Sequence, residues 1–144
     1  MRRLVILDTG PLVAFLSARD KYHDWTVSRW REIQPPFITC ESVLAEACYL
    51  LRSHPRARAS VLDLLGRGIV VVPFHLAEHA SPIAQLMKKY SNINMSLADA
   101  CLVRMADVVA NSSVLTLDSD FRLYRRANRT VLPVIMPDFG RPGK

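Results

Sequence analysis

Short apolar runs alternate with longer helical segments along the whole chain, and this alternation limits the folds that the chain can adopt. The runs are short, continuous and rich in Val, Ile and Leu, which is typical of buried strands. We expect five strands, at residues 3–7, 37–39, 69–73, 114–117 and 131–135. Strands that alternate with helices indicate an α/β fold with a mostly parallel sheet. In such sheets, ligands bind at the carboxyl ends of the strands.

The intervening segments carry helical periodicity and recognisable helix ends. We expect helices at residues 12–18, 21–33, 41–52, 55–65, 76–90 and 97–110. Thr9 offers a hydroxyl N-cap to the first helix. Ser96 is expected to cap the last one, with Asp99 at the capping-box position. Pro82 predicts a break or restart within residues 76–90.

Length and composition favour one folded domain. The chain has 144 residues, of which 50% are hydrophobic and 22% charged, so disorder is excluded as its main state. We predict a single domain over residues 1–137 and a loose tail over residues 138–144. Asp8 interrupts the N-terminal apolar run, and no run approaches the length of a membrane span. Three cysteines without CxxC spacing predict no disulfide framework, and we expect a cytoplasmic protein.

Four acidic residues stand in unusual places. Asp8 follows the first strand and Asp118 follows the fourth, where a helix cap or a turn would also explain an aspartate. Glu46 and Asp99 share a helix face with apolar residues by spacing. A capping box explains Asp99 equally well, and a salt bridge to an arginine could explain Glu46. An ionised carboxylate that faces a core is costly unless it is paired or bound to a metal.

Taken together, the four acids indicate a metal site. Two acids at strand ends and two on inward helix faces can converge on one pocket. Clustered carboxylates repel one another, and cations relieve that repulsion. Ligands that are all oxygen atoms select magnesium or manganese over zinc, and no zinc-binding pattern of His or Cys is present.

Four motifs in this order resemble those of the PIN-domain ribonucleases, most of all the VapC-type toxins of prokaryotic toxin–antitoxin pairs. The resemblance covers residues 3–136. The motifs are Leu7-Asp8-Thr9-Gly10-Pro11-Leu12, Val43-Leu44-Ala45-Glu46, Ser96-Leu97-Ala98-Asp99-Ala100 and Thr116-Leu117-Asp118-Ser119-Asp120-Phe121. The resemblance implies a central parallel sheet of strand order 3-2-1-4-5 flanked by helices.

The resemblance also implies an activity and a set of site residues. Asp8, Glu46, Asp99 and Asp118 match the acidic quartet of the family, which would hold one or two Mg²⁺ or Mn²⁺ ions and cleave RNA with an activated water. Asp8 and Asp99 would hold the better-bound ion. Asp120 matches a further acid that could share or replace the role of Asp118. Supporting roles fall to Thr9, Thr116 and Ser96, and Ser119 stands where the family often has a basic residue.

Charge and the resemblance together suggest the partners. The net charge of +6 favours a polyanion, with nucleic acid ahead of a membrane surface. Arg122, Arg125 and Arg126 follow the last acidic motif, and they are either an RNA-contacting surface or an exposed, solubilising face. The resemblance implies an RNA substrate, a small antitoxin that blocks the acidic pocket, and a second copy of the chain as a dimer partner. The alternative is a catalytically silent PIN-like interaction module, but degenerate members are expected to lose acids that this chain retains.

Overall fold

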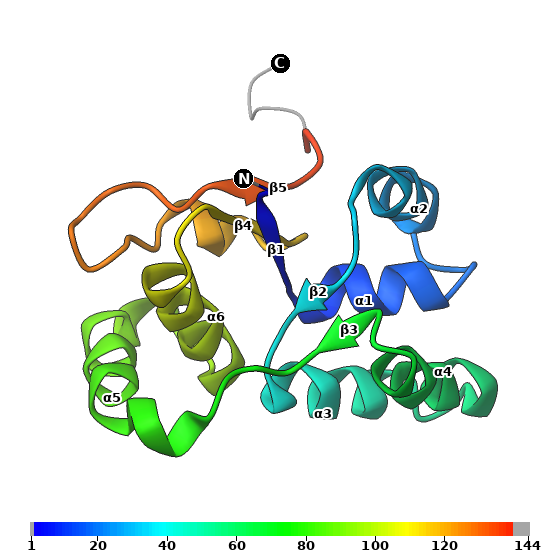
Figure 1. The fold of residues 1–144 in the computed structure, drawn as a ribbon, viewed down its shortest axis with the longest axis horizontal. Coiled ribbons are helices and arrows are strands. Elements are labelled where there is room, and N and C mark those ends of the chain that lie inside the picture. Colours follow the sequence, from blue (N-terminus) through cyan, green and yellow to red (C-terminus); the bar gives the residue numbers. More distant parts are fainter. Residues whose placement is uncertain (1, 140–144) are drawn as a thin grey trace.

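The computed structural model describes residues 2–139 and shows a parallel sheet with helices around it (Figure 1). The strands are β1 (Leu4–Leu7), β2 (Phe37–Ile38), β3 (Val70–Val71), β4 (Ser112–Leu115) and β5 (Val134–Ile135). Their order is β3-β2-β1-β4-β5, and every neighbouring pair is parallel. The predicted fold class and strand order are therefore confirmed.

The sheet places the first strand at its centre. In the register, Ile6 of β1 aligns with Ile38 on one side and Val114 on the other. These strand residues are almost completely buried, as expected for a parallel sheet covered on both faces. Four of the five strands are shorter than predicted, whereas β4 has its predicted length but begins and ends two residues earlier. β4 ends at Leu115, although the N–H of Thr116 still donates to the carbonyl of Ile135 at 3.1 Å.

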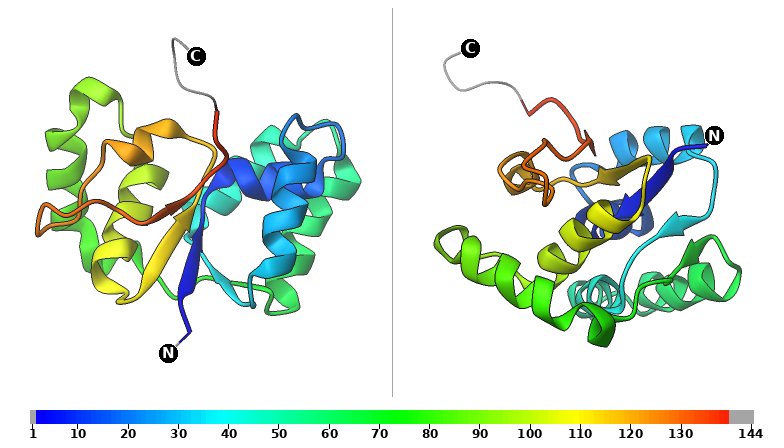
Figure 2. Two further views of the ribbon diagram at one scale, coloured as in Figure 1. Left: turned by 90° about the horizontal axis from the view of Figure 1, so that it is seen from above. Right: turned by 60° about the vertical axis from the view of Figure 1, so that its left-hand side comes forward.

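Six α-helices surround the sheet within the described range. They are α1 (Thr9–Leu16), α2 (His23–Glu32), α3 (Glu41–Leu50), α4 (Pro55–Gly66), α5 (Ala80–Lys89) and α6 (Leu97–Val108). Helices α1 to α4 gather on one side of the molecule, whereas α5 and α6 pair on the other (Figures 1 and 2). The described residues also form three short 3₁₀ helices, which are η1 (Leu76–His79), η2 (Ser91–Ile93) and η3 (Ser119–Arg122).

One predicted helix cap needs correction, whereas a predicted helix restart is confirmed. Thr9 does not cap α1, because Asp8 has the extended backbone of a cap and its Oδ1 accepts from the N–H of Thr9 at 2.8 Å. The restart predicted near Pro82 is confirmed, because η1 ends at His79 and α5 begins at Ala80. Pro82 lies in the first turn of α5, where its missing N–H leaves no helical hydrogen bond unmade.

The C-terminal end of the described chain lies near α2. The ring of Phe139 meets that of Tyr22 edge-on, with centroids 5.6 Å apart. Residues 140–144 of the predicted tail lie outside the described residues. No helix between residues 2 and 139 combines the length and apolar character that crossing a membrane requires.

Candidate active site

The acids at the strand ends come from neighbouring strands. Asp8 directly follows β1, and Asp118 lies three residues beyond the end of β4, which pairs with β1. Asp99 lies in the first turn of α6 and Glu46 in the second half of α3. The charge of Asp99 and that of Asp118 both act on Asp8 and on Glu46, raising the pKa of each. The structure thus gathers the four predicted acids near the carboxyl end of the sheet.

Asp8 is the most deeply placed of these acids, with only 6% of its surface exposed. Its Oδ1 accepts from the N–H of Thr9, and its Oδ2 accepts from the hydroxyl of Thr116 at 2.7 Å. Burial raises the pKa of Asp8 to about 7, and the nearby acids add to this effect against the two hydrogen bonds. Asp8 therefore exchanges its proton in the neutral pH range.

Thr116 connects the two strand-end acids. Its hydroxyl donates to Asp8 and accepts from the N–H of Asp118 at 2.9 Å. Asp118 in turn caps η3, since its Oδ1 accepts from the N–H of Asp120 at 2.9 Å. This chain of hydrogen bonds is buried at Thr116, which is completely inaccessible to solvent. Thr116 therefore fixes the relative positions of Asp8 and the turn that carries Asp118.

Asp99 forms the predicted capping box with Ser96. The N–H of Asp99 donates to Ser96 Oγ at 3.0 Å, and the N–H of Ser96 donates to Asp99 Oδ2 at 3.3 Å. Burial and the charge of Asp118 raise the pKa of Asp99, whereas its hydrogen bonds oppose the rise. Asp99 can therefore cap α6 and also belong to the acidic group, because a carboxylate that accepts a capping hydrogen bond can still accept others.

One residue that contacts the acids is not indicated by any pattern in the sequence. Tyr124 is fully buried and its hydroxyl donates to Asp99 Oδ2 at 3.2 Å. Its ring packs edge-on against Tyr90 and Phe121, with centroids 5.0 and 5.2 Å away. Burial and the charge of Asp99 raise the pKa of the Tyr124 hydroxyl, so it stays protonated and remains a donor. Nothing in the spacing of residues 119–130 indicates this contact.

The prediction that Glu46 lies on the apolar face of its helix is wrong. Val43 and Ala47 fill the buried side of α3, while Glu46 is exposed and Leu50, four residues on, is 49% exposed. Residues spaced three or four apart lie on the same face of a helix, but the spacing does not show whether that face is turned toward the core or toward solvent. Partial burial still raises the pKa of Glu46, as do the charges of Asp99 and Asp118. Glu46 therefore borders the acidic group from its solvent side.

Two further predicted residues lie at the edges of this group. Burial and the charge of Asp118 raise the pKa of Asp120, which is half-buried in η3. Thr9 Oγ1 is buried beside Asp8 and has no hydrogen-bond partner among the described residues. A buried hydroxyl without a partner is costly, so a ligand oxygen or water at that position would stabilise it.

The chemistry of this group suits a hard divalent cation. The donors are carboxylate and hydroxyl oxygens, which Mg²⁺ and Mn²⁺ prefer. The pKa values of Asp8, Glu46 and Asp99 are all raised by neighbouring acids, and a cation would reverse that effect. None of the four acids forms a salt bridge with a described residue. Between residues 2 and 139, no three His, Cys, Asp or Glu side chains stand close enough together to hold an ion in this arrangement.

The predicted RNA-contacting arginines lie next to the acids in η3 and the loop after it. Arg122 Nε donates to Met136 Sδ at 2.9 Å. One guanidinium nitrogen of Arg125 donates to the carbonyls of Arg122 and Tyr124, at 2.7 and 3.0 Å. Arg126 lines a pocket beside α5 and α6. These contacts hold the η3 turn together and leave the arginines without carboxylate partners among the described residues.

Comparison with known proteins gives one family and one fold. The model of a family described as the PIN domain matches residues 5–127. The crystal structure of VapC20 from Mycobacterium tuberculosis, described as a toxin that cleaves the sarcin-ricin loop, superposes with a TM-score of 0.68. It is 21% identical, and the match covers 81% of this chain and 91% of that one. No curated protein matches the sequence. At this identity, the structural likeness shows a shared fold.

Proposed function

The chain belongs to the PIN-domain family, and from this premise we propose that it is a metal-dependent endoribonuclease, the toxin of a toxin–antitoxin pair. The observation that carries the proposal is the convergence of Asp8, Glu46, Asp99 and Asp118 without a cationic partner among the described residues. Such a group of acids is costly in a folded protein unless a cation binds it. The likeness to the VapC20 fold supports the toxin assignment.

Asp8 and Asp99 are proposed to hold the better-bound Mg²⁺ or Mn²⁺ ion, with Glu46 and Asp118 completing a site for one or two ions. A divalent cation there would activate water for attack on a phosphodiester and stabilise the leaving oxygen. Thr116 orients Asp8, and Tyr124 orients Asp99 through its hydroxyl. Asp120 borders the site and is the alternative to Asp118 as a ligand.

The surroundings of the site favour a polyanionic substrate. Arg122, Arg125 and Arg126 lie beside the acids, and the chain carries a net charge of +6. We propose that these arginines contact RNA phosphates outside the acidic group. By family resemblance, the further partners are a small antitoxin and a second copy of the chain, and the protein acts in the cytoplasm.

The test is cleavage of a labelled pool of structured RNA by the purified protein in Mg²⁺, Mn²⁺ or EDTA. Asp99→Asn removes one proposed ligand, and Asp63→Asn is the matched control because Asp63 lies on the exposed surface of α4. We expect cleavage that needs the metal, disappears in Asp99→Asn and persists in Asp63→Asn. Cleavage that survives in Asp99→Asn would contradict the proposed site. Failure to cleave or to bind metal would favour the silent interaction module.

A further inference from the structure

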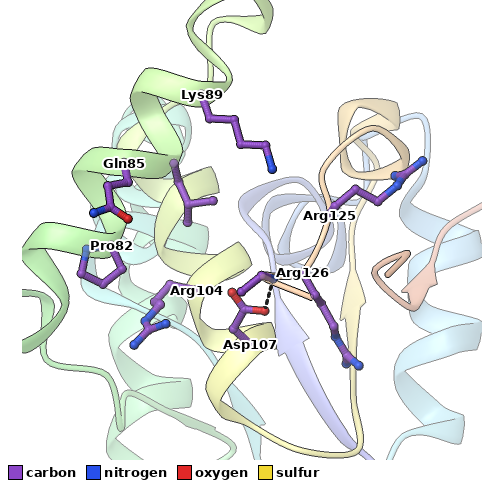
Figure 3. A pocket seen from close by; sticks show the side chains of 9 residues that line it. Pro82, Gln85, Lys89, Arg104, Asp107, Arg125 and Arg126 are labelled. Atoms are coloured by element: carbon purple, nitrogen blue, oxygen red, sulfur yellow. Dashed lines mark hydrogen bonds between the residues drawn. The ribbon is translucent and has the colours of Figure 1, made fainter. Parts of the chain in front are cut away.

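A pocket of about 260 Å³ opens between α5, α6 and the loop that follows η3 (Figure 3). Four cationic side chains line it, from three separate segments of the chain. They are Lys89, Arg104, Arg125 and Arg126. We propose that this pocket binds a backbone phosphate of the RNA strand, away from the bond that is cut. The proposal rests on the proposed function and extends the phosphate contacts of Arg125 and Arg126 to Lys89 and Arg104 of the same pocket.

The pocket has an excess of positive charge that its own residues do not neutralise. Asp107 is the one acid among its lining residues, and one of its carboxylate oxygens accepts from the N–H of Ala127 at 2.8 Å. None of the four cations forms a salt bridge within the described part of the chain. Four cations against one acid leave a net formal charge of +3 at the pocket. An anion that enters it meets cations that have no competing carboxylate partner.

The side chains are distributed around the opening. Lys89 extends from α5 into the space that faces the 125–127 loop, and Arg104 lies at the edge formed by α6 (Figure 3). The side chains of Arg125 and Arg126 extend outward from the 125–127 loop, away from Lys89 (Figure 3). Arg126 Nε is buried and has no hydrogen-bond partner among the described residues. That atom is closed to solvent, so it is not among the groups that an anion in the pocket contacts.

The pocket and the acidic group are connected through the same segment. Tyr124 donates to Asp99, and the next residue, Arg125, forms part of the pocket wall. The N–H of Arg125 donates to the hydroxyl of Tyr90 at 3.0 Å, which attaches this wall to the end of α5. Because Arg125 directly follows Tyr124, the pocket wall begins one residue from the contact with Asp99, and one nucleic-acid strand is inferred to contact both places.

A polynucleotide fits this arrangement better than a single small anion does. The cations line an open pocket and its rim instead of converging on one point, and they continue the basic side of the η3 turn. A backbone with repeated phosphates can use several of them at once. Arginine and lysine contacts of this kind release counterions, so RNA affinity falls with salt in proportion to the number of contacts.

Lys89→Gln provides the sharpest test, with Lys88→Gln as its matched control. Lys88 precedes Lys89 on α5, is exposed and does not line the pocket, so both variants lose one charge from the same helix. The assay is the fluorescence anisotropy of a labelled oligouridine in EDTA, titrated at several salt concentrations. We expect Lys89→Gln to bind about two- to fivefold more weakly than Lys88→Gln. The slope of log affinity against log salt should fall by about 0.7 in Lys89→Gln alone.

Variants at Arg104 separate the loss of charge from effects on folding. Arg104 Nε donates to His79 Nδ1 at 3.0 Å, so Arg104→Gln removes a structural contact as well as a charge. Arg104→Lys keeps the charge, and it should retain the wild-type salt slope that Arg104→Gln loses. Equal slopes for Lys88→Gln and Lys89→Gln would overturn the proposal, as would equal slopes for the two Arg104 variants.

Competition separates the RNA backbone from other anions. Inorganic phosphate at matched ionic strength should leave the oligouridine bound, because a single phosphate uses one contact only. If it displaces the oligouridine, or if polyaspartate loses affinity in Lys89→Gln while oligouridine does not, the RNA assignment is wrong. These results are distinguishable from a failure of the nuclease proposal. If the protein is not a nuclease, it does not cleave RNA in Mg²⁺, but the binding measurements in EDTA are unaffected.

Discussion

Replacing Asp8 with Asn should stabilise the metal-free protein while removing its metal site. Burial raises the pKa of Asp8 from 3.8 to about 7, a shift of roughly 3 pH units. At about 1.4 kcal/mol per unit, keeping Asp8 ionised lowers the free energy of unfolding by up to about 4 kcal/mol. Between about pH 4 and about pH 7, Asp8 keeps its proton in the folded state but has lost it in the unfolded state. Stability therefore falls as the pH rises from about 4 to about 7, and the whole loss is present above pH 7.

The substitution also removes a favourable contact. The amide oxygen of Asn can still accept from the N–H of Thr9, but the amide nitrogen cannot accept from the hydroxyl of Thr116. That loss is about 1–2 kcal/mol. The net gain above pH 7 is therefore about 2 kcal/mol, which raises the melting temperature of a chain of this size by about 4–8 °C.

Thermal melts in EDTA at about pH 8 and about pH 5 measure this effect, because the ionisation cost shrinks by about 2–3 kcal/mol between them. Asp8→Asn should be more stable than wild type at the higher pH and lose that advantage at the lower one. Added Mg²⁺ should stabilise wild type and leave Asp8→Asn unchanged. A difference between the two proteins that does not vary with pH, or equal stabilisation of both by Mg²⁺, would refute the reasoning.

Four further predictions concern the contacts around the acids. Thr116→Val removes hydrogen bonds to Asp8 and Asp118 and should lower the free energy of unfolding by about 2 kcal/mol, as measured by urea denaturation. Tyr124→Phe removes the hydroxyl that donates to Asp99 and should slow RNA cleavage by about two- to tenfold with the fold unchanged by circular dichroism. Asp118→Asn should reduce kcat by at least about a hundredfold and Asp120→Asn by less than about tenfold, and the reverse order would assign the ligand to Asp120. At limiting Mg²⁺, the cleavage rate should rise with pH up to about 7 and then level off, because Asp8 must lose its proton to bind the cation.

The fold was predictable because local sequence patterns indicate its strands and helices. Short apolar runs separated by helices indicate parallel strands, and the resemblance to the PIN-domain ribonucleases implies the strand order that the sheet shows. The capping box of Ser96 and Asp99 was predictable for the same reason, since both residues lie within one helical turn. Strand ends were less predictable, because the N–H of Thr116 still donates to the carbonyl of Ile135 beyond the end of β4.

The finer structure of the site depends on contacts between distant segments. The Tyr124 to Asp99 hydrogen bond joins residues 25 positions apart, and no periodicity reports such a pairing. Glu46 was placed on the wrong side of its helix because apolar residues occur on both sides of it, and Leu50 is exposed. Thr9 offers a hydroxyl cap to α1, but Asp8 fills that role while its second oxygen accepts from the hydroxyl of Thr116.

Titration of Mn²⁺ into the metal-free protein by calorimetry tests the central claim most directly. We expect binding in wild type and in Asp63→Asn, and loss of binding in Asp99→Asn. Near neutral pH, binding should release protons, since the pKa values of Asp8, Glu46 and Asp99 are raised and a cation requires their ionised forms. The measured enthalpy should therefore vary with the ionisation enthalpy of the buffer. Binding that is absent from wild type, or equal in Asp99→Asn and wild type, would contradict a metal site built from these carboxylates.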